Sequence, residues 1–300
     1  MAEIWGVLAA ALSSALGGAS IGVTRYVRDV VDPLAIGAFR FGLGFAFLFP
    51  VAVINGGKWP ARADWPAVAG LGLLFFAVFP ILFNASLILT TAARGSLALS
   101  TLPLLTMMVA ASLGVEGFTA RKTIGVLIAM MGVAMALLSG LSSAPPGAWR
   151  GDALMLCAAL CMAFYSVWSR PIIRRSGPLQ FTTMGMGIGA IVLIGASLAQ
   201  GSFSPVSDFG PPQWSAMIYL GLFGSALTFF LWSFALSRTT PTRVAISLAV
   251  NPVAAAFVGA IILDEPVGWS LIVGVSAVAI GIWVATTARR LHSLTSSKGI

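Results

Sequence analysis

Ten stretches of the chain are continuously apolar over the length that a helix needs to cross a bilayer. Such a helix requires roughly 17–25 mainly apolar residues, whereas a membrane β-strand would alternate apolar and polar positions. The stretches cover residues 4–24, 34–54, 66–89, 95–113, 122–140, 151–169, 179–200, 214–237, 243–262 and 268–288. Short segments rich in Gly, Pro and charge separate them. The pattern predicts an all-α integral membrane protein with ten transmembrane helices.

The second half of the chain repeats the first. At an offset of 149 residues Trp65 aligns with Trp214 and Arg94 with Arg243, and at an offset of 145 Pro33 aligns with Pro178. A four-residue insertion in the second half explains the change of offset. Because each repeat holds five helices, an odd number, the second must enter the membrane in the opposite sense. The predicted units are a first repeat at 1–140, a linker at 141–150, a second repeat at 151–288 and a polar tail at 289–300. Inverted repeats are typical of secondary transporters, an analogy of architecture.

Composition supports the membrane assignment. Hydrophobic residues make up 58% of the chain and charged residues only 9%, so lipid must cover part of the exterior. The net charge of +8 comes from short clusters at the ends of apolar stretches, which is a topology signal and excludes a nucleic-acid partner. Of the 17 Lys and Arg residues, twelve fall on the N-terminal side of the membrane and four on the other. We therefore expect a multi-pass protein of the bacterial inner membrane with both termini in the cytoplasm.

The reactive residues of the chain are few. The only histidine, His292, lies in the polar tail, and Cys157 and Cys161 are two small hydrophobes on one helix. This inventory predicts no metal site, no cofactor and no enzymatic activity. No Asp or Glu is assigned to the interior of a predicted span, so we expect gradient-driven movement of substrate without an intramembrane carboxylate relay.

Three residues inside predicted spans each have a structural and a functional interpretation. Pro103 and Pro252 occupy equivalent positions, and each frees a backbone carbonyl. They are either packing kinks or hinges that line a cavity and move during transport. Arg40, the only cation within a predicted span, either pairs with a helix-end carbonyl or a loop carboxylate such as Asp29 or Asp32, or attracts a substrate carboxylate.

Polar and aromatic residues recur near the middle of several predicted spans. Each one alone is also explained by packing between helices. Together they predict a substrate chamber with aromatic walls, in which planar ligands could stack. The candidate substrate-binding residues are Ser13, Arg40, Phe79, Phe83, Asn84, Ser100, Tyr165, Trp168, Thr228, Trp232, Ser247 and Asn251.

Both repeats carry a proline in mid-helix, a glutamate thirteen residues later, and two glycines in the next helix. The residues are Pro103, Glu116, Gly125 and Gly132 in the first repeat and Pro252, Glu265, Gly274 and Gly281 in the second. This pattern resembles the paired EamA domains of the drug/metabolite transporter superfamily, as does Phe39-Arg40-Phe41 after Pro33. The resemblance covers nearly the whole chain and implies that helices 1, 3, 4, 6, 8 and 9 surround a central cavity. The aromatic residues look most like those of the YddG-type aromatic amino-acid exporters. The two glutamates are expected to cap helices or to pair at the interface.

The predicted function is export of small metabolites, with amino acids and especially aromatic ones favoured, by alternating access between the repeats. Exporters of drugs or nucleotide-type metabolites are the nearest alternative. A channel and a lipid-modifying membrane enzyme are rivals of other classes, but the sequence lacks a clear polar stripe and a catalytic cluster. The expected partners are a small-molecule substrate and the lipid bilayer, with the protein a monomer and a dimer as the alternative.

Overall fold

The computed structural model describes residues 2–27, 30–90, 95, 98–117, 119–141, 146–251, 254 and 269–286, and every regular element in this part of the chain is a helix. Pro252, Glu265 and the tail at 289–300 lie outside the described residues. Five helical stretches within the described ranges are long and apolar enough to cross a membrane. They are Pro33–Ile54, Arg62–Ser86, Ala148–Arg175, Pro178–Ala199 and Pro211–Arg238. The all-α prediction is confirmed.

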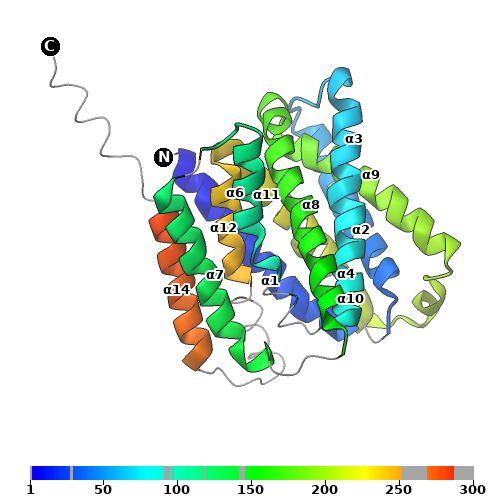
Figure 1. The fold of residues 1–300 in the computed structure, drawn as a ribbon. Coiled ribbons are helices and arrows are strands. Elements are labelled where there is room, and N and C mark those ends of the chain that lie inside the picture. The colour runs from blue at the N-terminus through cyan, green and yellow to red at the C-terminus, as the bar shows by residue number, and fades with distance from the viewer. Residues whose placement is uncertain are drawn as a thin grey trace, which may run out of the picture.

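The described helices follow the ten apolar stretches in order (Figure 1). Those of the first repeat are α1 (Ala2–Val27), α2 (Pro33–Ile54), α3 (Trp65–Leu73), η2 (Leu74–Val78), α4 (Phe79–Leu89), α6 (Leu102–Ser112) and α7 (Ala120–Leu141). Those of the second are α8 (Ala148–Arg175), α9 (Pro178–Ala199), α10 (Pro211–Gly221), η4 (Leu222–Leu227), α11 (Thr228–Arg238), α12 (Pro241–Ile246), η5 (Ser247–Ala249) and α14 (Trp269–Thr286). Two 3₁₀ turns, η1 (Arg62–Asp64) and η3 (Ser204–Asp208), lie in equivalent connections of the two repeats.

Proline sets the start of several helices. Pro33, Pro178 and Pro241 occupy the first turn of α2, α9 and α12. The first turn has no intrahelical partner for its N–H groups, so proline loses nothing there and its fixed φ favours the helix. Asp32 adds a cap to α2, because its side chain accepts a hydrogen bond from the Leu34 N–H at 2.8 Å.

Contacts between helices follow the internal repeat. The helices α2 and α9, α6 and α12, and α7 and α14 each pack against their own counterpart. The helix α1 packs against α11 as α8 packs against α4, and α10 packs against α2 as α3 packs against α9. Figure 1 shows α1 descending from the N-terminus and α8 rising toward that same end of the bundle. The two repeats are therefore related by a pseudo-twofold axis, with a seam of helices from both.

The third helix of each repeat contains a π-helical segment at the same place. The first repeat has η2 between α3 and α4, and the second has η4 between α10 and α11. An offset of 149 places Leu74 on Phe223, so the two segments coincide in the alignment. In the first repeat Pro80 stands in the first turn of α4, just after η2, and its missing N–H removes a regular helical hydrogen bond. Such segments are rare and change the phase of a helix, which affects the residues that face the seam.

Candidate substrate site

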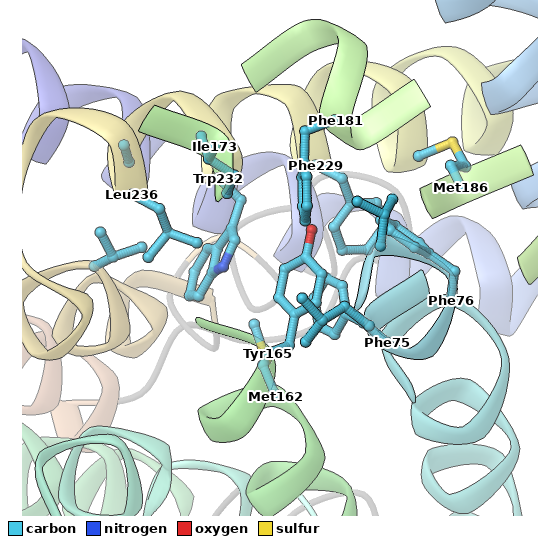
Figure 2. Close-up of a cluster of buried hydrophobic side chains, with 14 of the residues drawn as sticks. Phe75, Phe76, Met162, Tyr165, Ile173, Phe181, Met186, Phe229, Trp232 and Leu236 are labelled. Carbon is cyan, nitrogen blue, oxygen red and sulfur yellow. The ribbon is translucent and has the colours of Figure 1, made fainter. Parts of the chain in front are cut away.

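Five aromatic residues from both repeats meet at the seam. This aromatic cluster consists of Phe41 on α2, Phe75 and Phe76 on η2, Tyr165 on α8 and Phe229 on α11. The ring of Phe75 stacks on Tyr165 with centroids 4.0 Å apart, and Phe229 meets Phe75 and Phe76 edge to face at 5.3 and 5.2 Å. All five side chains are buried, and Figure 2 shows four of them close together, namely Phe75, Phe76, Tyr165 and Phe229. The centre of the structure is thus a packed aromatic core at the place where a chamber is predicted.

Two hydrogen-bond donors in this core are left over. The hydroxyl of Tyr165 and the indole N–H of Trp232 are buried and make no hydrogen bond of acceptable geometry. The hydroxyl of Ser233, which is hydrogen-bonded to Thr182 at 2.6 Å, lies close to the Tyr165 hydroxyl without meeting hydrogen-bond geometry. In Figure 2 the nitrogen of Trp232 lies on the side of its ring that faces Tyr165. Buried polar groups nearly always find a partner. Other buried hydroxyls of the described residues, such as those of Ser14 and Thr106, also lack one, but Tyr165 and Trp232 carry their donors on aromatic rings of the core.

Ser13 and Thr228 lie together, as the predicted chamber requires. The Ser13 hydroxyl on α1 donates to the backbone carbonyl of Thr228 on α11 at 2.7 Å. The Thr228 hydroxyl in turn donates to the carbonyl of Phe223 at 2.7 Å. That carbonyl lies in η4, where the π-helical geometry interrupts the regular i to i+4 pattern. Both candidate residues therefore have hydrogen-bonding roles at the irregular part of the second repeat.

Arg40 lies against the same π-helical segment. Its Nε donates to the Ser225 hydroxyl at 3.0 Å, and its Nη2 donates to the Gly224 carbonyl at 2.7 Å. Its guanidinium also lies 5.8 Å from the ring centroid of Phe41. Of the alternatives drawn from the sequence, this geometry favours pairing with a backbone carbonyl. The carbonyl belongs to a π-helical segment within a span, and Asp32 instead caps α2.

Other predicted residues lie around the aromatic cluster. Phe79 continues it along α4, with its ring centroid 5.5 Å from Phe75, and Phe83 follows at 5.9 Å from Phe79. Pro103 is buried in α6, which places it in the protein interior without testing its role as a hinge.

The remaining polar candidates are buried to different degrees. Ser247 is fully buried, and its hydroxyl donates to the carbonyl of Arg243, one turn earlier in the chain, at 3.3 Å. Asn84, Ser100 and Asn251 are partly buried. The Ser247 hydroxyl is thus satisfied locally, which is the packing alternative drawn from the sequence.

Trp168 lies outside the aromatic cluster. It was expected beside Tyr165 in the chamber, but 48% of it is exposed, and it shares the outer face of α8 with Leu156 and Leu160. Three residues along a helix place Trp168 only about 60° around α8 from Tyr165, and its ring contacts Phe164 with centroids 4.8 Å apart. The assignment of Trp168 to the chamber stays a prediction.

The sequence argument also missed residues at the centre. Its candidate residues do not include Phe75 or Phe76, which are both fully buried in the aromatic cluster. Phe229 was not considered at all. The spacing of Phe75, Phe79 and Phe83 by four residues was an available signal for one continuous aromatic face.

Polar contacts join the two repeats at each end of the seam. At the end that holds the N-terminus, Glu116 accepts a hydrogen bond from the Thr242 N–H at 3.2 Å and pairs with Lys122 at 2.6 Å. The predicted capping role of Glu116 is confirmed, because Thr242 lies in the first turn of α12. At the opposite end the Thr90 hydroxyl donates to Asp152 at 2.8 Å. Asp152 lies within α8, which corrects the statement that the spans contain no acidic residue.

Comparison with known proteins agrees with this architecture. The sequence model of the EamA-like transporter family matches residues 4–138 and again residues 149–287. The chain belongs to the EamA-like transporter family. It is therefore a multi-pass membrane transporter built from two repeats, and its relatives are likewise described as transporters.

The relatives share low identity over most of their length. An uncharacterized transporter of Archaeoglobus fulgidus is 25% identical over 95% of this chain and 99% of its own. The uncharacterized transporter YyaM of Bacillus subtilis is 24% identical over 91% of each chain. A protein of Streptantibioticus cattleyicolor described as a probable terminal-alkyne amino-acid exporter is 25% identical over 69% of this chain and 68% of its own.

A solved crystal structure has the same fold. It superposes with a TM-score of 0.77 at 23% identity and covers 97% of this chain and 98% of its own. At that identity the likeness concerns the fold alone.

Proposed function

We propose that this EamA-family transporter exports small metabolites, in particular amino acids with aromatic ones favoured, by alternating access through the seam. We place it in a bacterial inner membrane with both termini in the cytoplasm, because twelve Lys and Arg residues fall on the N-terminal side against four on the other.

The observation that carries the proposal is the pair of unmatched donors in the aromatic cluster. An apolar core that buries the Tyr165 hydroxyl and the Trp232 N–H without acceptors is poorly satisfied by itself. A substrate carboxylate would supply acceptor oxygens to both donors. The rings of Phe75 and Phe229 would then contact the apolar part of the same molecule.

Two further observations support this substrate class. The relative from Streptantibioticus cattleyicolor is described as an amino-acid exporter, which makes amino acids a sensible first choice. Arg40 already donates to Gly224 and Ser225, so a multiply charged nucleotide would find few cations within the described part of the spans.

Alternating access requires contacts that break at one end of the seam while those at the other end hold. Glu116 and Thr242 join the repeats at the N-terminal end, together with an ion pair between Glu3 and Arg243. Thr90 and Asp152 join them at the other end. Substrate entry would also separate Phe75 from Tyr165, because their stacked rings fill the centre of the seam.

The test is uptake of labelled amino acids into proteoliposomes by wild type, Tyr165→Phe and Trp232→Phe. Each substitution keeps an aromatic ring and removes one donor, so we expect about a ten-fold loss of flux for a carboxylate-bearing substrate, the effect of one lost hydrogen bond. Tyr219→Phe is the matched control, because Tyr219 lies on α10 and contacts Phe223 outside the cluster. Normal transport of every substrate by both variants would refute the assigned site.

Coupling is tested in the same vesicles. We propose movement down the substrate gradient without a carboxylate relay, because Asp152 lies near the start of α8 and bonds Thr90 at the end of the seam. Flux should then be similar with and without an imposed pH gradient. Strong uphill transport driven by protons would contradict this part of the proposal.

A further inference from the structure

A hollow of about 600 Å³ opens at the N-terminal end of the bundle, and its lining contains none of the residues of the aromatic cluster. It lies between the loop that follows α2 and the turn that joins α8 to α9. Its lining consists of Lys58, Trp59, Ala61, Asp64, Arg175 and Ser176. The proposed transport mechanism assigns no role to these residues.

The loop that forms one wall is fixed to the other wall. The Gly177 N–H donates to the Lys58 carbonyl at 2.9 Å, and the Gln180 side chain donates to the Ala52 carbonyl at 3.2 Å. Arg175 and Asp64 form an ion pair across the hollow at 2.8 Å. These bonds use the backbone of Lys58, so its ammonium group remains exposed in a hollow whose shape is set by other contacts.

The hollow lies at the depth of lipid headgroups. The last turns of α2 expose Phe49, Val53 and Ile54, the last of them to 84%, which is expected of a helix surface in contact with lipid. Immediately beyond them, Trp59 and Trp65 are 40% and 49% exposed. Half-exposed indoles next to the end of an apolar helix mark the boundary between hydrocarbon and headgroups.

The charge around the hollow is positive. Lys58 and Arg175 line it, two more exposed cations lie next to lining residues in the chain, and Asp64 is the acidic residue in the lining, already paired with Arg175. The two further cations are Arg62 and Arg174. The equivalent connection of the second repeat, residues 200–210, contains no Lys or Arg and carries Asp208. The charge of this connection therefore follows the side of the membrane and not the repeat, so this hollow is basic whereas the equivalent connection is not.

We propose that this hollow binds the headgroup of an anionic phospholipid. The phosphate would contact the Lys58 ammonium and the Arg175 guanidinium, with the Trp59 indole beside the glycerol region and the acyl chains along the apolar end of α2. Basic pockets at the ends of membrane helices suit such headgroups. A soluble phosphate compound shares the charged group, but the apolar end of α2 and the indoles favour a ligand with hydrocarbon chains. This proposal does not depend on what the transporter carries.

The test is native mass spectrometry of the purified full-length protein titrated with phosphatidylglycerol or phosphatidylcholine. Wild type should bind phosphatidylglycerol preferentially. Lys58→Gln should weaken that binding about five-fold, the usual effect of one interfacial cation. Asp64→Asn should strengthen it, because it removes the negative charge and releases Arg175.

Two variants on the opposite end serve as controls. Asp208→Asn makes the same charge change in the equivalent connection, and Arg150→Gln removes an exposed cation beside Trp149. Both should bind phosphatidylglycerol as wild type does. Equal binding of the two lipids, or unchanged binding by Lys58→Gln and Asp64→Asn, would overturn the proposal. Displacement of the lipid by millimolar inorganic phosphate would identify a soluble-anion site and would also overturn it.

Discussion

The two π-helical segments have the same position in the repeat but different surroundings. In the first repeat, η2 presents Phe76 to α9, where Gly185 and Gly189 leave room for the ring and its backbone. In the second repeat, η4 presents Ser225 to α2, where Arg40 and Gly44 take the places of those two glycines. Offsets of 145 and 149 relate these positions residue by residue.

A large side chain therefore meets a small one in both contacts, but from opposite partners. In the first contact the helical segment η2 supplies the bulk and α9 supplies glycine. In the second, α2 supplies the long Arg40 and η4 supplies Gly224 and Ser225. The backbone irregularity is common to both repeats, whereas the chemistry that fills the space around it is not. Arg40 donates to a backbone carbonyl and a hydroxyl of the π-helical segment, so a half-buried cation here is explained by structure before function.

The largest expected effect is on cysteine labelling, which tests whether the two repeats have opposite orientations in the membrane. Ala63→Cys and Ser207→Cys place exposed thiols in equivalent connections, in a background without Cys157 and Cys161. A membrane-impermeant maleimide should label them from opposite sides of sealed vesicles, in an all-or-none manner. Labelling of both from one side would show that the repeats run in the same direction and would end the comparison.

A double-mutant cycle tests whether the large and the small side chain in the contact between α2 and η4 can exchange places. Arg40→Gly leaves the Gly224 carbonyl without its donor, and Ser225→Phe forces a ring into the space of the guanidinium. We expect each single change to cost about 1–3 kcal/mol of stability, measured by thermal unfolding in detergent. The double variant recreates the glycine and phenylalanine pair of the first repeat, so it should be more stable than the sum of the single effects predicts. Simple additivity would contradict the proposed exchange.

The glycines of the two contacts should differ in their tolerance of a methyl group. A Cβ at Gly189 would overlap the Cβ of Phe76, and it would lie 2.9 Å from that residue's backbone carbonyl, so Gly189→Ala should cost about 1–3 kcal/mol. At Gly44 the nearest atom, at 2.8 Å, is the sulfur of Met186, a flexible side chain that can move, and Gly44→Ala should cost less.

Gly195→Ala is the control for both glycine variants, because it lies on α9 and a Cβ there meets nothing within 4 Å. Its thermal stability should match that of wild type to within about 0.5 kcal/mol. If Gly44→Ala proved as damaging as Gly189→Ala, the second contact would be as rigid as the first.

The smallest expected effect is on stability, and it comes from the Thr228 hydroxyl, which donates to a backbone carbonyl of η4. Thr228→Val removes the donor to the Phe223 carbonyl and should lower stability by about 1 kcal/mol. Thr183→Val is matched for burial, but the Thr183 hydroxyl bonds the Leu179 carbonyl within a regular helix, where a backbone N–H already serves that carbonyl. It should therefore cost less. Equal unfolding temperatures for the two variants would argue against a special role for the threonine in the π-helical segment.

Much of the fold could be predicted from the amino-acid sequence. Apolar stretches of membrane-spanning length gave the helices and their sequence, and the paired Trp and Pro residues revealed the repeat. Glu116 was recognisable as a cap because it follows an apolar stretch in a charged connection. These features depend on local composition and on the requirement that lipid-exposed backbone satisfy its own hydrogen bonds, so they can be deduced without coordinates.

The candidate site depended on features that no local pattern specifies. The sequence named Tyr165 and Trp232 among its candidates, and both are buried in the core, but it left out Phe75 and Phe76, which lie beside Tyr165. Facing directions were estimated from a uniform helical period, whereas a π-helical segment shifts that period in one helix of each repeat.

Arg40 shows the same limit, because its partner Ser225 is 185 residues away and is brought near only by the packing of α2 against η4. Helix length and hydrophobicity are encoded locally and were readable from the sequence. The phase of each helix and the pairing across the seam arise only when the two repeats pack together, because both depend on contacts between residues far apart in the chain.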